Sequence, residues 1–357
     1  MNKSFTTQEL VIHLTLRCPL KCAHCCVDAD INKSEELQYN TVLKCIINSA
    51  KIPTIEKVSF TGGDPFVSRK TLEAGIKQAT SQGLSTSVVT SAFWAKTAKR
   101  AEHIIETLKI AGLKEIMLSY DDSHAQYLEE HFIINAFNAS VKAGLIVKVN
   151  VVREPNDKID KAYLTAILDP NGSYKNQLKI FETAVNSTGR AKEDDSVQMR
   201  QDRAANDQVY RGPCTSVLRH ISAQSDGNWV PCCGVIKPPK ALHKGQVDSS
   251  SLETVVKQAH KDPVLQWLAY EGPVAMLKQI TANTDNPLED ADFDGICHAC
   301  DRLFNEATHR KLLAKALPNK IYSLTIQHLI YEQIGLNASP ELTQINTNKE
   351  QAEVIHE

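Results

Sequence analysis

LVIHLTLRCPLKCAHC, at residues 10–25, joins a short run of β-branched and apolar residues to three closely spaced cysteines. The run predicts a buried strand that ends where the cysteines begin. Five similar runs follow at 56–61, 84–90, 115–120, 145–152 and 178–185. Amphipathic stretches of helix length separate these runs, so the pattern predicts repeated βα units around a parallel sheet.

Six such units predict an α/β fold, a partial (β/α)6 TIM-like barrel rather than a closed eight-stranded one. The intervening helices are expected at 38–50, 68–82, 97–111, 124–143 and 157–168. In such a barrel the loops that follow the strands gather at one end, where we expect the reactive site. Helical spacing of apolar residues returns at 249–284 and 302–334, which predicts a smaller C-terminal module.

The composition is that of an ordinary globular protein, with 42% hydrophobic residues, 23% charged residues and a net charge of -2. Both signs of charge are spread along the chain, which argues against a nucleic-acid partner or a membrane surface. We find no secretory signal and no run of the roughly 18 apolar residues that a spanning helix needs. The sequence therefore predicts a cytoplasmic protein.

Nine of the ten cysteines fall into two groups, at 18–26 and 214–300. In a reducing compartment, closely spaced thiols bind metal more often than they form disulfides. Cys18, Cys22 and Cys25 are separated by three and then two residues. A loop with this spacing can direct three thiolates at one iron–sulfur cubane and leave one iron without a protein ligand.

The spacing of Cys18, Cys22 and Cys25 resembles the signature of the radical S-adenosylmethionine (SAM) superfamily. Thr61-Gly62-Gly63-Asp64-Pro65 is similar to the GGE segment of that family, with Asp in place of Glu. The resemblance implies a catalytic [4Fe–4S] cluster on the three cysteines. It also implies that SAM is bound by Gly62, Gly63, Asp64, Ser91, Ser119 and Asn150.

The same resemblance implies a chemistry. The reduced cluster would cleave SAM to a 5′-deoxyadenosyl radical, which abstracts a hydrogen atom from the substrate, and the protein would position the reactants. An electron donor such as flavodoxin or ferredoxin is implied as a partner.

The second cysteine group has the spacing Cys214-x12-Gly227-x4-Cys232, followed later by Cys297-x2-Cys300. Four such thiols can close a complete [4Fe–4S] site. The pattern resembles the shortened SPASM domain known as a twitch domain, and implies one auxiliary cluster. Thr188-Gly189-Arg190-Ala191 resembles the turn that commonly joins the two modules. We therefore predict a radical SAM core at 1–190, an auxiliary-cluster domain with C-terminal helices at 191–335, and a polar tail at 336–357.

Three further thiols have no assigned ligand role. Either Cys232 or Cys233 could ligate the auxiliary cluster, and the spacing from Gly227 favours Cys232. Cys26, Cys45 and Cys233 are of a type most often buried as a small apolar residue. The alternative is that one of them donates a hydrogen atom to a substrate radical, as an epimerase would require.

The segment Asp121-Asp122-Ser123-His124 follows the fourth predicted strand. Asp121 and His124 are candidate catalytic residues, because an Asp–His pair could take a proton from a substrate radical or alcohol. Asp122 or Ser123 is expected to cap the next helix.

These observations favour an oxidoreductase that modifies a ribosomally synthesised peptide, by cross-linking or epimerisation. An alternative is a twitch-type dehydrogenase that oxidises a secondary alcohol of a small sugar-like substrate. A third possibility is a zinc-stabilised binding module without catalysis, in which Cys22-x2-Cys25 and Cys297-x2-Cys300 would form a structural metal site.

Overall fold

The fold was analysed in a computed structural model, which describes residues 6–174, 177–192, 197–205, 209–234 and 240–333. The predicted polar tail at 336–357 lies outside the described residues. One sheet of eight strands dominates the structure, in the order β6-β5-β4-β3-β2-β1-β7-β8. Its strands are β1 (Glu9–Thr15), β2 (Lys57–Gly62), β3 (Ser85–Thr90), β4 (Glu115–Ser119), β5 (Ile146–Arg153), β6 (Leu178–Ala184), β7 (His220–Ala223) and β8 (Trp229–Val230).

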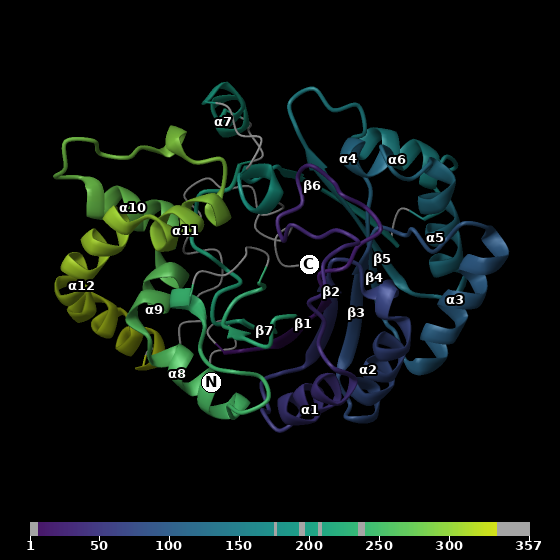
Figure 1. The fold of residues 1–357 in the computed structure, drawn as a ribbon, viewed down its shortest axis with the longest axis horizontal. Coiled ribbons are helices and arrows are strands. Elements are labelled where there is room, and N and C mark those ends of the chain that lie inside the picture. The colour runs from purple at the N-terminus through teal and green to yellow at the C-terminus, as the bar shows by residue number, and fades with distance from the viewer. Residues whose placement is uncertain (1–5, 175–176, 193–196, 206–208, 235–239, 334–357) are drawn as a thin grey trace.

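The first six strands are parallel and neighbours in chain order, as a partial (β/α)6 barrel requires. Figure 1 shows the sheet curving through the molecule with the N-terminal helices along its outer side. The predicted fold class is confirmed, and each of the six predicted strands agrees with an observed strand to within one residue at both ends. The strands were predictable because alternate residues of a strand face the same side of the sheet. In β1, Leu10, Ile12 and Leu14 are fully buried in the core between the sheet and its helices.

The helices on the outer side of the sheet are α1 (Tyr39–Ser49), α2 (Arg69–Ser81), α3 (Ala98–Ala111), α4 (Asp122–Ala125), α5 (Glu130–Lys142) and α6 (Lys161–Leu168). The prediction of one helix over 124–143 was wrong, because α4 ends at Ala125 and α5 begins only at Glu130. The predicted cap was also wrong. The carboxylate of Asp121, rather than Asp122 or Ser123, accepts the His124 N–H at 3.0 Å and begins α4. Asp122 instead accepts the backbone N–H groups of Lys158 and Ile159.

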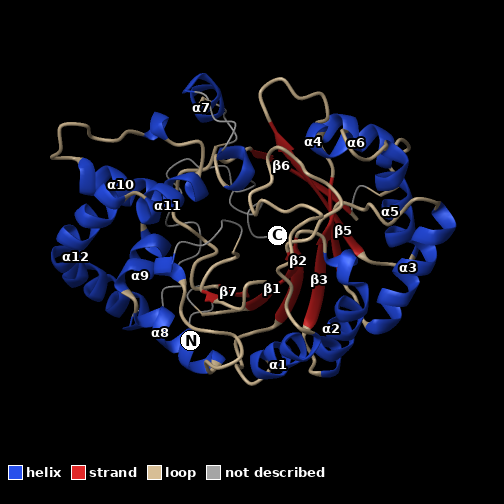
Figure 2. Ribbon diagram, in the orientation of Figure 1, coloured by secondary structure: helices blue, strands red, loops and turns tan. Residues whose placement is uncertain are grey.

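The C-terminal part packs around a second core. Its helices are α9 (Pro263–Tyr270), α10 (Gly272–Thr281), α11 (Ile296–Asn305) and α12 (Ala307–Gln333), which lie across from α3 and α5 in Figure 2. α8 (Leu252–Lys261) lies beside α1 and joins the two cores, with Leu252 and Val255 in the barrel core and Ala259 in the second. α7 (Val197–Ala204) comes before them in the chain. β7 pairs in parallel with β1, so the sheet continues past the predicted division at residue 190. That division stays a prediction. Within the described residues, no helix combines the length and apolar character needed to cross a bilayer.

Candidate active site

Cys18, Cys22 and Cys25 lie in the loop that leaves β1, at the carboxyl end of the parallel sheet. All three line one cavity of about 490 Å³. The loop is tightly folded, since the Cys25 N–H donates to the Cys22 carbonyl at 3.2 Å and the Cys18 N–H donates to the Asp30 carbonyl at 3.1 Å. The Cys25 sulfur accepts the Ala29 N–H at 3.3 Å. The three thiols predicted to hold the first cluster are therefore brought to the same cavity.

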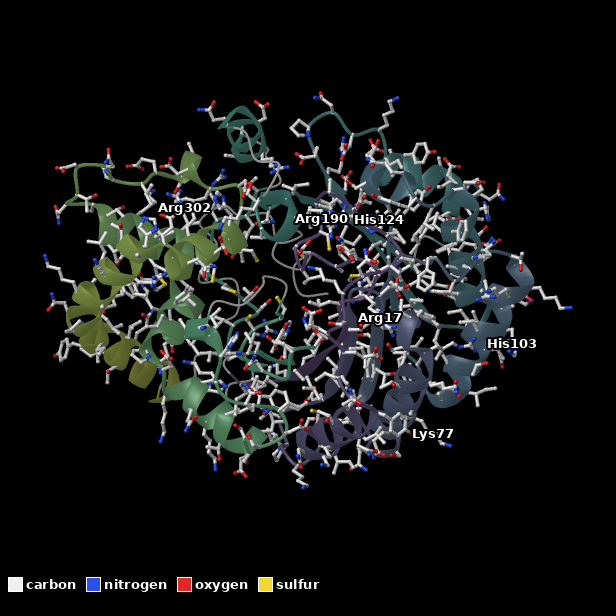
Figure 3. All side chains as sticks on the ribbon, in the orientation of Figure 1. Arg17, Lys77, His103, His124, Arg190 and Arg302 are labelled. Atoms are coloured by element: carbon white, nitrogen blue, oxygen red, sulfur yellow. The ribbon has the colours of Figure 1, made fainter. Side chains whose placement is uncertain are left out.

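Arg190 holds this cysteine loop from the far end of the barrel. Its guanidinium is buried and donates to the carbonyls of Cys22 at 2.7 Å and Ala29 at 2.6 Å, and it pairs with Asp28 at 3.0 Å. Its backbone N–H donates to the Cys25 carbonyl at 3.0 Å. Figure 3 shows Arg190 and His124 toward the middle of the molecule, away from Lys77 and His103 at its rim.

Gly62 and Gly63 line the cavity where β2 ends, close to the end of β1. A Cβ on Gly62 would lie 2.3 Å from the Thr15 carbonyl oxygen, and a Cβ on Gly63 would lie 2.3 Å from that of Arg17. Gly62 also has a φ of +134°, which residues with a side chain rarely adopt. The two glycines are thus required by the close approach of β2 to the end of β1 and to the start of the cysteine loop, in addition to any approach of a ligand.

The Asp64 carboxylate points into the protein. It is fully buried and accepts hydrogen bonds from the Ser91 N–H and hydroxyl at 2.9 and 2.8 Å, from the Thr90 hydroxyl at 2.9 Å and from the Phe66 N–H at 3.1 Å. Burial raises the pKa of Asp64 above its usual value even though these hydrogen bonds oppose the change. Asp64 therefore ties the end of β2 to the end of β3, while Ser91, Ser119 and Asn150 line the cavity itself.

The second cysteine group gathers at the second core. Cys214, Cys232, Cys297 and Cys300 pack against it and line a smaller cavity of about 40 Å³, together with Cys233. The Cys232 sulfur accepts the Gly234 N–H at 3.3 Å. Cys214, Cys233 and Cys297 also line the larger cavity, so the two cysteine groups border a common space. Of the thiols without a predicted ligand role, Cys26 and Cys233 line the larger cavity, whereas Cys45 is buried in α1.

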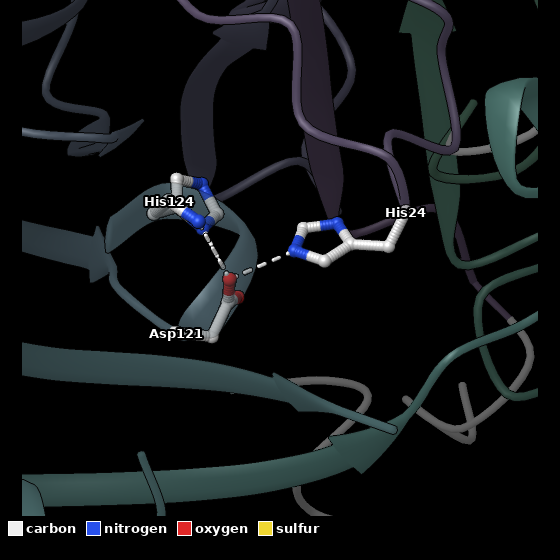
Figure 4. A group of neighbouring side chains, drawn as sticks. All are labelled: His24, Asp121 and His124. Atoms are coloured by element: carbon white, nitrogen blue, oxygen red, sulfur yellow. Dashed lines mark hydrogen bonds and ion pairs between the residues drawn. The ribbon is translucent and has the colours of Figure 1, made fainter. Parts of the chain in front are cut away.

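Asp121 lies between two imidazoles at the end of β4 (Figure 4). Its Oδ1 is 2.8 Å from Nδ1 of His124 and 2.9 Å from Nε2 of His24, a residue of the cysteine loop. Burial opposes ionisation, but the charge and hydrogen bonds of His124 and His24 hold the pKa of Asp121 well below its usual value. A carboxylate at these distances accepts an N–H from each imidazole. Both histidines line the larger cavity, and Nε2 of His124 has no hydrogen-bond partner among the described residues.

The barrel interior below the cysteine loop is polar. Glu9, Lys57, Ser59 and Glu115 line the cavity, and Lys57 Nζ lies 3.2 Å from Oε1 of Glu115. Barrels of this type usually fill their interior with bulky apolar side chains. This end of the cavity therefore offers charged and hydroxyl groups to a ligand.

Comparison with known families decides the identity of the barrel. Residues 12–152 match the family model described as the radical SAM superfamily. The chain contains a radical SAM domain. This family implies a [4Fe–4S] cluster and SAM, and the matched residues include the cysteine loop, both glycines, Ser91, Ser119 and Asn150.

Several curated proteins resemble the whole chain or its radical SAM domain. The "Putative peptide biosynthesis protein YydG" of Bacillus subtilis (strain 168) is 24% identical over 83% of this chain and 92% of its own length. The PqqA peptide cyclase of Granulibacter bethesdensis is 28% identical over 39% of this chain and 36% of its own length. A GTP 3′,8-cyclase of Campylobacter curvus is 28% identical over 40% of this chain and 46% of its own length.

Solved structures also resemble the chain, among them BtrN and HydG. BtrN in complex with AdoMet and 2-DOIA has 12% sequence identity and a TM-score of 0.43, covering 74% of this chain and 88% of that chain. HydG, a maturase of the [FeFe]-hydrogenase, has 12% identity and a TM-score of 0.41, covering 96% and 84%.

The thiols of the radical SAM domain fit the implied cluster. Burial, followed by the charge of Asp64, raises the pKa of Cys18 to about 12, and burial likewise raises the pKa of Cys22. Such thiols ionise only beside a strong positive charge, which cluster iron would provide. The cavity also has unsatisfied polar atoms for a ligand to bind. Oδ1 of Asn186 and Oγ1 of Thr188 are buried without a partner in the described part of the chain, and both residues line the cavity.

The sequence did not predict that His24 and Asn186 belong to the site, or that Arg190 holds the cysteine loop. His24 stands inside the cysteine signature, which was the one signal that could have drawn attention to it. The Arg190 segment was recognised only by resemblance, because its contacts reach back about 160 residues along the chain.

Proposed function

We propose that this chain is a radical SAM enzyme that modifies a ribosomally synthesised peptide. The observation that carries the proposal is the common cavity, which both cysteine groups border and whose barrel end carries charged and hydroxyl side chains. The peptide substrate is supported by the names of two relatives, a peptide biosynthesis protein and a peptide cyclase. The first of these is similar along nearly the whole chain.

In this proposal the first cluster is held by Cys18, Cys22 and Cys25. The cluster and SAM, when bound, supply the radical that removes a hydrogen atom from the substrate. Gly62 and Gly63 present backbone to SAM, with side-chain contacts from Ser91, Ser119 and Asn150. Asp64 acts by positioning Ser91, since its own carboxylate is saturated.

A second [4Fe–4S] cluster would be held by Cys214, Cys232, Cys297 and Cys300, within an auxiliary-cluster domain at 191–335. The hydrogen bond from Gly234 to the Cys232 sulfur supports Cys232 as the ligand, because N–H donors to sulfur are a usual feature of such sites. Electrons for the first cluster would come from a flavodoxin or ferredoxin.

Asp121 and His124 would form the acid–base pair. Asp121 fixes the tautomer of His124 by accepting from Nδ1, which leaves Nε2 as the basic atom at the cavity. A substrate proton within hydrogen-bond reach of Nε2 can then move to it.

The placement of the remaining thiols favours inversion of a residue over cross-linking. Cys26 and Cys233 both line the cavity. A thiol there can give its hydrogen atom to a substrate radical from the side opposite the one abstracted, which reverses the configuration and leaves a thiyl radical. One electron passed through the proposed second cluster, with one proton from solvent, would restore the thiol. His13 holds the backbone beside one of these thiols, because its Nε2 lies 2.9 Å from the Cys233 carbonyl oxygen.

The proposed cleavage of SAM is tested by incubating anaerobically reconstituted protein with dithionite and SAM. We expect 5′-deoxyadenosine from the wild type and from C45A, whose thiol lies in α1, and none from C18A. Absence of 5′-deoxyadenosine from wild-type protein that contains iron would contradict the proposal.

The proposed peptide substrate is tested with peptides encoded by short reading frames beside the gene. Each peptide is incubated with the reconstituted enzyme in D2O. Inversion predicts incorporation of one solvent deuterium per modified residue, and its loss in C26A or C233A. Loss of two hydrogen atoms from the peptide would indicate a cross-link instead. Failure of every such peptide to react, together with oxidation of a sugar-like alcohol, would identify the dehydrogenase.

A further inference from the structure

His24 places an imidazole inside the loop that carries the three cysteines, one residue before Cys25. Its side chain is 11% exposed and lines the cavity. Imidazole is a competent ligand of iron in iron–sulfur clusters, and an iron without a protein ligand is open to it. A histidine at this point in the chain is therefore a potential competitor for the coordination position that SAM needs.

The imidazole is engaged by Asp121. The carboxylate has no exposed surface, and its position is set by the His124 N–H at 3.0 Å, by Nδ1 of His124 at 2.8 Å and by the Val152 N–H at 3.3 Å. These partners belong to α4 and β5, outside the cysteine loop. Nε2 of His24, which lies 2.9 Å from Oδ1, is thus hydrogen-bonded to a group that the barrel fixes in place.

We propose that Asp121 is a positioning residue that holds the His24 imidazole in the cavity wall, away from the iron that Cys18, Cys22 and Cys25 leave open. The inference rests on the proposed first cluster. Asp121 would then have two roles, one for each imidazole that contacts its carboxylate. It orients His124 as a base, and it keeps His24 from binding iron.

The simpler explanation is that the Asp121–His24 contact merely anchors the loop. The loop has other anchors, however. Arg190 binds the Cys22 and Ala29 carbonyls, the Cys18 N–H binds the Asp30 carbonyl, and the Tyr127 hydroxyl donates to the Lys21 carbonyl at 2.9 Å. The fold of the loop therefore has support that does not pass through His24.

Four variants separate these explanations: D121A, H24A, the double variant H24A/D121A, and H124A as the control for the second imidazole that D121A releases. Each is reconstituted anaerobically and its iron content is measured. The reduced protein is then examined by electron paramagnetic resonance with and without SAM, and by pulsed measurements of 14N coupling without SAM.

We expect the spectral change caused by SAM to be lost in D121A and a 14N coupling to appear there. H24A and H124A should respond to SAM as the wild type does, and H24A/D121A should regain the response and lack the coupling. A normal response in D121A, a lost response in H24A, or a double variant as unresponsive as D121A would overturn the inference. Wild-type protein that forms no cluster on Cys18, Cys22 and Cys25 would instead contradict the proposed function.

Discussion

Arg190 is the residue on which the cysteine loop most depends. It makes two hydrogen bonds and an ion pair to the loop while buried, and Gly189 beside it has no room for a side chain against the carbonyls of Cys25 and Cys26. Hydrogen bonds from a charged group contribute about 1.5–3 kcal/mol each. The loop is therefore held open toward the cavity by a residue from beyond β6.

We predict that R190A binds less iron at the first site while the auxiliary site keeps its iron. Without the guanidinium, three partners in the loop lose their donor, and the thiols are no longer held together. Iron analysis and the loss of 5′-deoxyadenosine formation measure the effect. R310A is the matched control, because exposed Arg310 also donates to two carbonyls, those of Phe304 and Asn305, far from the loop. Equal iron contents in R190A and R310A would contradict the role of Arg190 in holding the cysteine loop.

The sequence predicted which cysteines come together at one cavity, but it did not predict the residues that hold them there. The spacing of Cys18, Cys22 and Cys25 was enough to predict that their thiols lie close together. The role of Asp64 could not be predicted, because its partners Thr90 and Ser91 are met only when β2 and β3 pair in the sheet. His24 was overlooked for the same reason, since its partner Asp121 lies 97 residues away.

Asp294 connects the exit of β6 to the beginning of α11. Its carboxylate accepts the Ser187 N–H at 3.0 Å and lies 2.9 Å from Nδ1 of His298, one residue after Cys297. Burial opposes its charge, but His298 and Ser187 hold the pKa of Asp294 below its usual value. The folded-state pKa is thus lower than that of the unfolded chain. Its stabilising effect is present above the unfolded-state pKa and is lost as the pH falls through the folded-state pKa.

We predict that D294N lowers the free energy of unfolding by about 1–3 kcal/mol at neutral pH. The difference between wild type and variant should shrink as the pH falls, since the wild-type carboxylate then takes up a proton. Anaerobic chemical unfolding at several pH values measures this difference. D290N is the control, because Asp290 pairs with Lys278 on the surface and its side chain is 63% exposed. A difference that grows toward acid pH would contradict the assignment.

At the element scale, the β-strands were predictable because alternate residues of each strand face a helix-covered core. The break between α4 and α5 was not, since it depends on Asp121 capping α4 while also binding His24. β7 was missed because its four residues carry too short a pattern, and its place beside β1 is set by tertiary pairing.

In the whole molecule, each of the two cysteine groups packs against its own hydrophobic core, and both groups line one cavity. Sequence spacing predicted both groups, whereas their common space follows from β7 joining the barrel sheet at β1. Because the groups rest on separate cores, each should hold its metal without the other.

We predict that C297A/C300A keeps the first cluster and still forms 5′-deoxyadenosine, while the iron content falls from about eight to about four per chain. Conversion of a peptide should be lost, since the second cluster that would return an electron to the thiol is gone. Iron analysis and product chromatography measure these outcomes. Loss of all iron in this variant would show instead that the two sites form only together.

In the proposed first cluster, three thiolates leave one iron open to SAM. Pulsed electron–nuclear double resonance on the reduced wild-type protein, with SAM labelled by 15N at its amino group and 17O at its carboxylate, tests it most directly. We predict coupling of both labels to the cluster, and none in C18A. A cluster in the wild type that shows neither coupling would contradict it.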